Sequence, residues 1–137
     1  MAENRIIKLG KKCDFQCHQM EHQLGAYTDC NHGAGLAVLH PVLYRHIYRD
    51  AVPKFKRFAT AVWGVDPAGK RDEEAAAAGV EALADFIKEM GLPASFREMG
   101  IGPGTDFEAI ANSTNPTVGC CRKLTHEEIL EILKECL

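Results

Sequence analysis

The chain has 137 residues, of which 46% are hydrophobic and 26% are charged, and its formal net charge at pH 7 is −3. This length corresponds to one domain, and the composition is that of a globular protein and not of a disordered tail. The lysines and arginines are spread along the chain, so nothing indicates binding to nucleic acid or to an anionic membrane surface. No apolar run reaches the ~20 residues that a membrane span needs, and residues 1–12 lack the apolar segment of a signal peptide. We therefore expect a single domain over residues 1–137 and a cytoplasmic location.

The six cysteines are expected to be free thiols, because a reducing compartment keeps thiols reduced. Their spacing matches no CxxC zinc motif. Cys13 and Cys17 are four residues apart and could share a metal on a helix, but small buried residues are the favoured interpretation. We assign the cysteines no function.

The first two predicted elements are helices that carry most of the histidines. Residues 14–27 place apolar and histidine side chains at three- and four-residue steps, which is the period of a helix. After a turn, residues 32–50 are apolar enough to form a buried helix. Pro41 lacks a backbone donor and should kink this helix or end its first half.

The rest of the chain also has helical periods. Helices are predicted over residues 52–64, where Gly64 acts as terminator, and over residues 71–91, which begin with acidic residues and end at Gly91. Residues 92–101 are expected to form a connector with one helical turn. Two further helices should begin at capping boxes, formed by Thr105 with Glu108 and by Thr125 with Glu128. Six or seven helices without a strand predict an all-α helical bundle.

Histidines concentrate in the first two helices. Four residues of a helix turn through about 400°, so His18 and His22 lie on one face about one turn apart. His32 begins the next helix and can face this pair if the two helices are antiparallel neighbours. Imidazole is a common ligand of zinc and iron, so the spacing permits a metal site, although the spacing alone favours histidines that bind no metal. The alternative is a group of surface histidines or core histidines with satisfied hydrogen bonds.

The other histidines lack this support. We expect His40 to make a hydrogen bond inside the helix pair, and we interpret His46 and His126 as surface residues.

The segment HQMEHQLGAYTDCNHGAGLAVLHP, from His18 to Pro41, resembles the histidine segment of the iron-containing alcohol dehydrogenase family. That family has roughly the pattern H-x-x-x-H-x-L-G-x-x-x-x-x-x-H-G, followed by small apolar residues and a proline. Later segments are similar in kind and order to the helical second domain of the family, which belongs to the dehydroquinate synthase-like fold. Within the family the chain looks most like the butanol dehydrogenase-like branch. The segments are residues 52–65, 81–101 and 124–133.

The resemblance implies roles for three histidines. In the family an Asp and a His from one helix and two further histidines hold the metal, and His18 and His32 match the last two ligands. His22 matches the histidine beside the nicotinamide and the substrate. The implied chemistry is hydride transfer between a small alcohol or aldehyde and NAD(P), with a divalent metal, iron or zinc, polarising the substrate oxygen. His22 would relay the proton or orient the nicotinamide ring.

The chain also departs from the family pattern. Nothing in it resembles the family's nucleotide-binding domain with its glycine-rich phosphate loop, so we expect that N-terminal domain to be absent, together with the first two metal ligands. Asp14 and His18 imitate the missing Asp-x-x-x-His pair, but the register after His18 favours the third-ligand position. The family's Asn-Pro-Arg is Asn-Pro-Thr here, at residues 115–117.

Three functions remain open at this stage. The first is the metal-binding half of an alcohol dehydrogenase, incomplete and inactive alone. The second is a stand-alone helical metal-binding or interaction module that uses His18, His22 and His32. The third is one subunit of a split dehydrogenase that docks onto a nucleotide-binding protein. An apolar surface left by a missing domain would favour self-association, so we expect a homo-oligomer.

Overall fold

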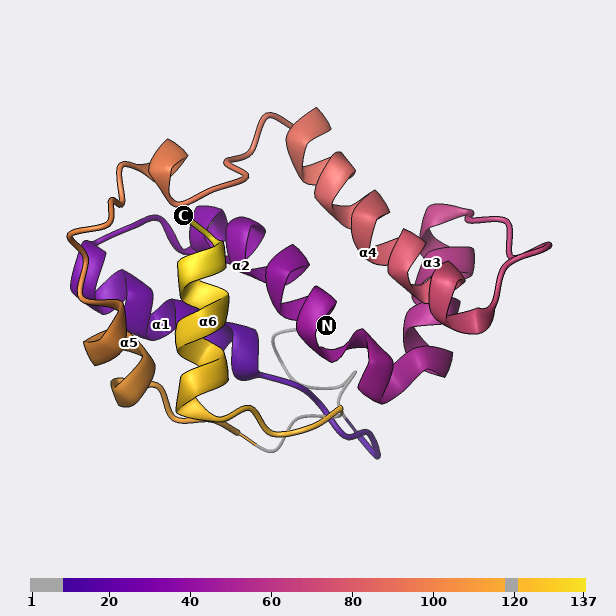
Figure 1. Ribbon diagram of the computed structural model, residues 1–137, viewed down its shortest axis with the longest axis horizontal. Coiled ribbons are helices and arrows are strands. Elements are labelled where there is room, and N and C mark those ends of the chain that lie inside the picture. Colours follow the sequence, from indigo (N-terminus) through magenta and orange to yellow (C-terminus); the bar gives the residue numbers. More distant parts are fainter. Residues whose placement is uncertain (1–8, 118–120) are drawn as a thin grey trace.

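The computed structural model describes residues 9–117 and 121–137 (Figure 1). Within these residues there are six α-helices and two short 3-10 helices, and no strand occurs among them, which confirms the predicted all-α fold. No helix in the described ranges combines the length and the apolar character that crossing a membrane requires. In chain order the elements are α1 (Gln16–Thr28), α2 (His32–Ile47), η2 (Tyr48–Ala51), α3 (Val52–Trp63), α4 (Asp72–Glu89), η3 (Arg97–Met99), α5 (Phe107–Ser113) and α6 (His126–Glu135).

Helix α2 is the central element of the fold. Figure 1 shows α1, α5 and α6 grouped around one end of α2, α4 running beside α2, and α3 at the other end. Contacts connect α2 to α1, α4 and α6, so a large part of its surface is covered by neighbours. A helix buried on several faces is apolar nearly all round, which explains the run GLAVLHPVL. Its buried residues are Gly35, Ala37, Val38, Leu39, Pro41, Val42, Leu43 and Ile47.

Pro41 lies inside α2, so of the two predicted effects, a kink or an end of the helix, the end is not found. The helix continues to Ile47, and η2 follows directly. Because proline has no N–H, one carbonyl of the preceding turn loses its donor within the helix. The side chain of Pro41 is buried, and packing in the core offsets that local cost.

Local capping signals explain most helix ends. Helix α1 begins at Gln16, whose backbone N–H donates to Asp14 Oδ1 at 3.0 Å. Helix α3 ends as predicted at Gly64, which has a φ of 65°. Glycine adopts this left-handed conformation without a steric penalty.

The two predicted capping boxes have different outcomes. The box of Thr125 and Glu128 opens α6 as predicted, with the Glu128 N–H donating to Thr125 Oγ1 and the Thr125 N–H donating to Glu128 Oε2. The prediction of a capping box formed by Thr105 and Glu108 is wrong. Helix α5 is instead capped by Asp106, whose Oδ1 accepts from Ala109 N at 2.9 Å. A carboxylate is a strong N-cap acceptor, and it displaces the start by one residue.

The core lies where α1, α2, α5, α6 and the connector after α4 meet. Phe96, in that connector, is fully buried and stacks on Phe107 with ring centroids 5.9 Å apart. Its N–H donates to the Cys136 carbonyl at 2.7 Å, which joins the connector to the end of α6. Other fully buried side chains are Met20, Leu24, Leu39, Leu43, Ile47, Ile110, Leu124, Ile129, Ile132 and Leu133.

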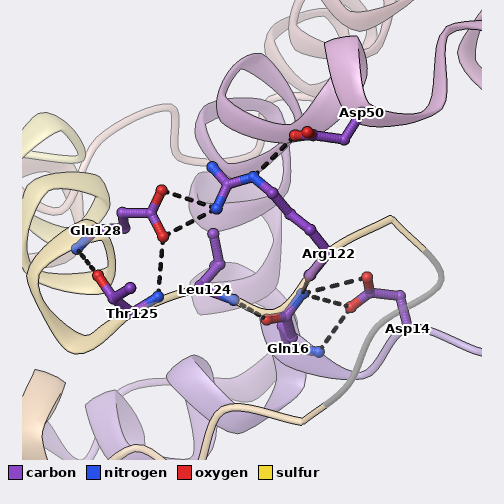
Figure 2. A network of polar contacts seen from close by, with 7 residues as sticks. All are labelled: Asp14, Gln16, Asp50, Arg122, Leu124, Thr125 and Glu128. Atoms are coloured by element: carbon purple, nitrogen blue, oxygen red, sulfur yellow. Dashed lines mark hydrogen bonds and ion pairs between the residues drawn. The ribbon is translucent and has the colours of Figure 1, made fainter.

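A polar network joins the start of α1 to the segment before α6 (Figure 2). The Gln16 side chain is 1% exposed, and its Nε2 donates to the Arg122 carbonyl while its Oε1 accepts from Leu124 N, both at 2.8 Å. The buried amide therefore satisfies two backbone groups far away in sequence.

The Arg122 guanidinium extends the same network to two more elements. Its Nε donates to Asp50 Oδ2 in η2 at 2.8 Å, and its Nη1 lies 2.7 Å from Glu128 Oε1 at the start of α6. The hydrogen bond that Arg122 donates to Glu128 lowers the pKa of the Glu128 carboxyl.

Helices α3 and α4 approach closely at Gly79, and we predict that a methyl group there destabilises the fold. A Cβ at Gly79 would lie 2.5 Å from Ala59 Cβ and 2.7 Å from Ala59 Cα, which is too close. Gly79→Ala should therefore lower the free energy of unfolding by about 1–3 kcal/mol, measured by urea denaturation. Gly25→Ala is the control, because its Cβ would meet nothing nearer than 3.6 Å and alanine favours a helix. Equal stability of the Gly79 variant and the unmodified chain would contradict this packing.

The Gln16 amide should be essential to the join between α1 and the segment before α6. Gln16→Leu leaves the Arg122 carbonyl and the Leu124 N–H without their partner, which should lower the free energy of unfolding by roughly 2–4 kcal/mol. Gln23→Leu, at a half-buried position of the same helix, is the matched control in thermal and urea denaturation. A loss no larger than that of the control would contradict the role of Gln16.

The ion pair of Arg122 and Glu128 predicts a pH dependence. Because the pKa of Glu128 is lowered in the folded state, its contribution to stability is complete above the unfolded pKa of ~4.3 and is lost as the pH falls through the folded value. Glu128→Gln should therefore lower stability at pH 7 and make the decline below about pH 4.5 shallower. Urea denaturation at a series of pH values measures this, with Glu131→Gln, at an exposed position of α6, as control. Parallel pH profiles for the Glu128 variant and the unmodified chain would contradict the prediction.

Candidate functional site

The turn between α1 and α2 brings the rings of His18, His22 and His32 together. The ring centroids are 5.5 Å apart for His18 and His32, 5.6 Å for His22 and His32, and 6.1 Å for His18 and His22. His22 and His32 are exposed and His18 is half-buried. The cluster thus opens to the outside of the molecule, and it comes from two adjoining helices.

These distances fit a shared metal ion. An imidazole nitrogen binds zinc at about 2.0–2.1 Å, which places the ring centroid roughly 3 Å from the ion, so two rings on one ion are about 5–6 Å apart. The pair of His18 and His32 falls within this range. Nitrogen donors of this kind suit zinc and iron. The assignment of these two histidines as ligands, and of His22 as catalyst, stays a prediction.

The sequence interpretation missed Glu21, which belongs to the same cluster. Its side chain is 2% exposed, and its Oε2 contacts His32 Nδ1. Donor atoms of Glu21, His22 and His32 all lie within 4.8 Å of one another. A signal was present in the sequence. Position 21 falls on the apolar face that α1 forms with Cys17, Met20 and Leu24, where an acidic residue is unusual.

Gly35 makes room for the Glu21 carboxylate. A Cβ at Gly35 of α2 would lie 2.9 Å from Glu21 Cγ and 3.0 Å from its Oε1, and a Cβ at Gly25 of α1 would lie 3.6 Å from that oxygen. Gly35 therefore allows α2 to pack directly on the carboxylate.

His40 lies next to the cluster but is held by its own helix. Its ring centroid is 6.3 Å from that of His18, and its Nδ1 donates to the Leu36 carbonyl at 2.8 Å. Burial lowers the pKa of His40, so the ring is neutral near pH 7. The expected hydrogen bond is present, and it lies within α2.

The two histidines interpreted as surface residues differ. His126 is exposed, and its Nε2 donates to the Thr114 carbonyl at 3.0 Å. His46 is less exposed than predicted, with 20% of its side chain accessible, because it packs beside Glu135 and its Nε2 lies 3.1 Å from the Glu135 carboxylate.

A mainly apolar pocket of about 220 Å³ adjoins His40. It lies between α2, α3 and the start of α1, and Phe55 and Phe58 of α3 form part of its wall. His40 and Asp14 are the polar groups on the side of α1 and α2. The remaining lining residues are Cys17, Leu43, Tyr44, Ile47, Lys54 and Cys121.

Asp14, Cys13 and Cys17 do not extend the histidine cluster. Asp14 and Cys13 precede α1, so neither forms a helical four-residue pair as considered from the sequence. Asp14 accepts hydrogen bonds from Gln16. Cys17 is buried, and burial raises the pKa of its thiol. Cys13, Cys17, Cys30 and Cys136 are free thiols, and Cys120 lies outside the described residues.

Comparison with known sequences identifies relatives over almost the whole chain. Residues 4–137 match the family described as Fe-containing alcohol dehydrogenase family, C-terminal. NADH-dependent butanol dehydrogenase A of Clostridium acetobutylicum is 36% identical over 140 residues, which cover 98% of this chain and 36% of the relative. Lactaldehyde reductase of Escherichia coli is 33% identical over 118 residues, which cover 84% of this chain and 30% of the relative.

Solved structures of the same family share the fold. NADH-dependent butanol dehydrogenase A from Thermotoga maritima superposes with a TM-score of 0.78 and 32% identity, covering 90% of this chain and 33% of that protein. An alcohol dehydrogenase from Oenococcus oeni gives a TM-score of 0.81 with 27% identity, covering 90% and 32%. The chain thus spans about a third of the length of these relatives. It belongs to the iron-containing alcohol dehydrogenase family, of which it represents the C-terminal, helical region.

Proposed function

We propose that this chain forms the metal-binding, substrate-side half of an NAD(P)-dependent alcohol dehydrogenase that acts on a small alcohol or aldehyde. The observation that supports this most is the convergence of three imidazole rings from α1 and α2, with ring centroids 5.5–6.1 Å apart. Relatives named as butanol dehydrogenases and lactaldehyde reductase support the substrate class. We expect the NAD(P) site to lie outside these 137 residues, so that the isolated chain is inactive.

Each histidine has a separate task in this proposal. His18 and His32 hold the divalent metal, iron or zinc, together with ligands from outside this chain. When bound, the metal would polarise the oxygen of the alcohol or aldehyde as a Lewis acid. His22 is exposed, so it can reach both substrate and solvent, and one of its ring nitrogens exchanges a proton with the substrate oxygen. Because the rings stand on helices, the protein fixes their relative positions before substrate arrives.

The apolar pocket beside His40 supports a substrate with a short hydrocarbon chain. Phe55 and Phe58 offer apolar surface. His40 lines the same pocket, and its ring centroid lies 6.3 Å from that of His18. A neutral His40 adds no charge to the pocket wall near pH 7. Burying a CH₂ group there would contribute about 0.8 kcal/mol to binding.

A second candidate function rests on the close grouping of Glu21, His22 and His32. Two imidazoles and one carboxylate whose donor atoms lie within 4.8 Å of one another could bind a metal without any further domain. The chain would then be a stand-alone metal-binding module without redox chemistry. The two functions differ in the ligands that they need. The dehydrogenase site uses His18 and His32, whereas the group of Glu21, His22 and His32 has Glu21 in place of the His18 that was predicted for a stand-alone module.

The cytoplasmic location, the homo-oligomeric state and the split-enzyme arrangement stay predictions. A split enzyme would reduce aldehydes with NAD(P)H only when its nucleotide-binding partner is added.

The test is metal titration of the metal-free chain by calorimetry with Co²⁺ and Zn²⁺. We expect one ion per chain, and we expect His18→Ala and His32→Ala to lose most of the affinity because each removes a ligand. His22→Ala should keep it. His126→Ala, which changes an exposed histidine on α6, is the control and should bind metal like the unmodified chain.

Other results would change the assignment. Loss of affinity in His22→Ala with full affinity in His18→Ala would favour the stand-alone module. Absence of binding in the unmodified chain would contradict that module, whereas the dehydrogenase site takes further ligands from outside this chain. An alcohol-dependent NAD(P) reduction assay on the same samples should show no turnover. Turnover would contradict the expectation that the cofactor-binding half is needed.

A further inference from the structure

We propose that Glu21 is a positioning residue for His32. Its buried carboxylate accepts a hydrogen bond from His32 Nδ1, which sets the ring orientation and leaves Nε2 as the nitrogen available to a metal. The inference rests on the proposed function, in which His32 is a ligand, and it adds to that function a residue from the opposite helix.

Burial and contact support the hydrogen bond. The Glu21 side chain is 2% exposed, whereas that of His32 is 53% exposed, and the two meet through Glu21 Oε2 and His32 Nδ1. An ionised carboxylate removed from water needs a partner to offset the lost hydration. Among the contacts of the described residues, the partner of Glu21 is the ring of His32. The carboxylate thus holds the inner edge of a ring whose outer edge is accessible.

The packing of the two helices is adapted to this side chain. Gly35 of α2 lies so close that a Cβ there would meet Glu21 Cγ at 2.9 Å and Oε1 at 3.0 Å. A Cβ at Gly25 of α1 would lie 3.6 Å from Glu21 Oε1, which is an ordinary van der Waals contact. A carboxylate therefore fills the space between α1 and α2 with little room to move, and a fixed acceptor orients a ring better than a mobile one.

The geometry favours positioning over direct metal binding by Glu21. One oxygen is already engaged with His32 Nδ1, and the Glu21 side chain is buried whereas His22 and His32 are exposed. A histidine ligand commonly donates its second ring N–H to a carboxylate, which selects the tautomer and raises the basicity of the nitrogen that binds the metal. His32 and Glu21 have the partners that this arrangement requires.

The first measurement needs no metal. Long-range ¹H–¹⁵N correlation spectra of the ¹⁵N-labelled full chain report which nitrogen of His32 carries the proton. We expect the Nδ1–H form in the unmodified chain and in Glu21→Gln, whose amide oxygen is still an acceptor. Glu21→Met removes the acceptor and should shift His32 towards the Nε2–H form. Glu135→Gln is the matched control, because it changes a second carboxylate that contacts a histidine, His46, and should leave the His32 signals unchanged.

The second measurement is the Co²⁺ affinity and visible spectrum of the same variants. Glu21→Met should weaken binding by about 10–100-fold with the stoichiometry unchanged, and Glu21→Gln should weaken it less. A purely structural role would not produce a change of the His32 tautomer in Glu21→Met together with the recovery of affinity in Glu21→Gln. Circular dichroism checks that each variant is folded, and the His32 tautomer of the unmodified chain decides the question if Glu21→Met is not.

The outcomes separate the inference from the function on which it rests. An Nε2–H form of His32 in the unmodified chain overturns the inference, whether or not cobalt binds. Equal cobalt affinity in all folded variants also overturns it, and so does complete loss of binding in Glu21→Gln with an unchanged His32 tautomer, which would make Glu21 a ligand. Absence of cobalt binding in the unmodified chain would bear only on the proposed function, whose other ligands lie outside this chain, while the tautomer would still decide whether Glu21 holds His32.

Discussion

The close packing of α1 on α2 around the buried Glu21 carboxylate is the constraint on which the site depends. A buried carboxyl group requires a hydrogen-bond partner, and His32, the first residue of α2, supplies it. Gly35 lets the backbone of α2 approach, and any side chain there would collide with Glu21. The same contact that satisfies the carboxylate therefore sets the separation of the two helices and places His32 opposite His18 and His22.

A second set of polar contacts holds the beginning of α1. Gln16 binds the backbone on either side of Lys123, and Arg122 connects that segment to η2 and to α6 (Figure 2). His18 lies two residues after Gln16, in the first turn of the helix. The network thus limits the freedom of α1 at one end while the Glu21 contact limits it one turn further along. Rigid placement of this kind matters for a metal site, because its ligands must be in position before the ion arrives.

The arrangement is consistent with a region that works as part of a larger protein. Its histidines stand at the open side of the α1–α2 pair, and the chain spans about a third of the length of its relatives. The buried part of the candidate site consists of Glu21 and the close approach of Gly35. The exposed half presents His22 and His32, and we propose that the remaining metal ligands and the nicotinamide cofactor approach it from outside.

Features that depend on neighbouring residues could be predicted from the sequence. The end of α3 at Gly64, the capping box of Thr125 and Glu128, and the four-residue step between His18 and His22 all follow from local backbone geometry. Features that depend on contacts between distant segments could not. Pro41 stays inside a helix because the core packs around it, and Gln16 is buried because it meets backbone groups more than 100 residues away. The sequence by itself determined the helical class, the family and the three histidines. Only the tertiary structure decided that an acidic residue on the apolar face of α1 joins them, because the reason for its burial lies on another helix.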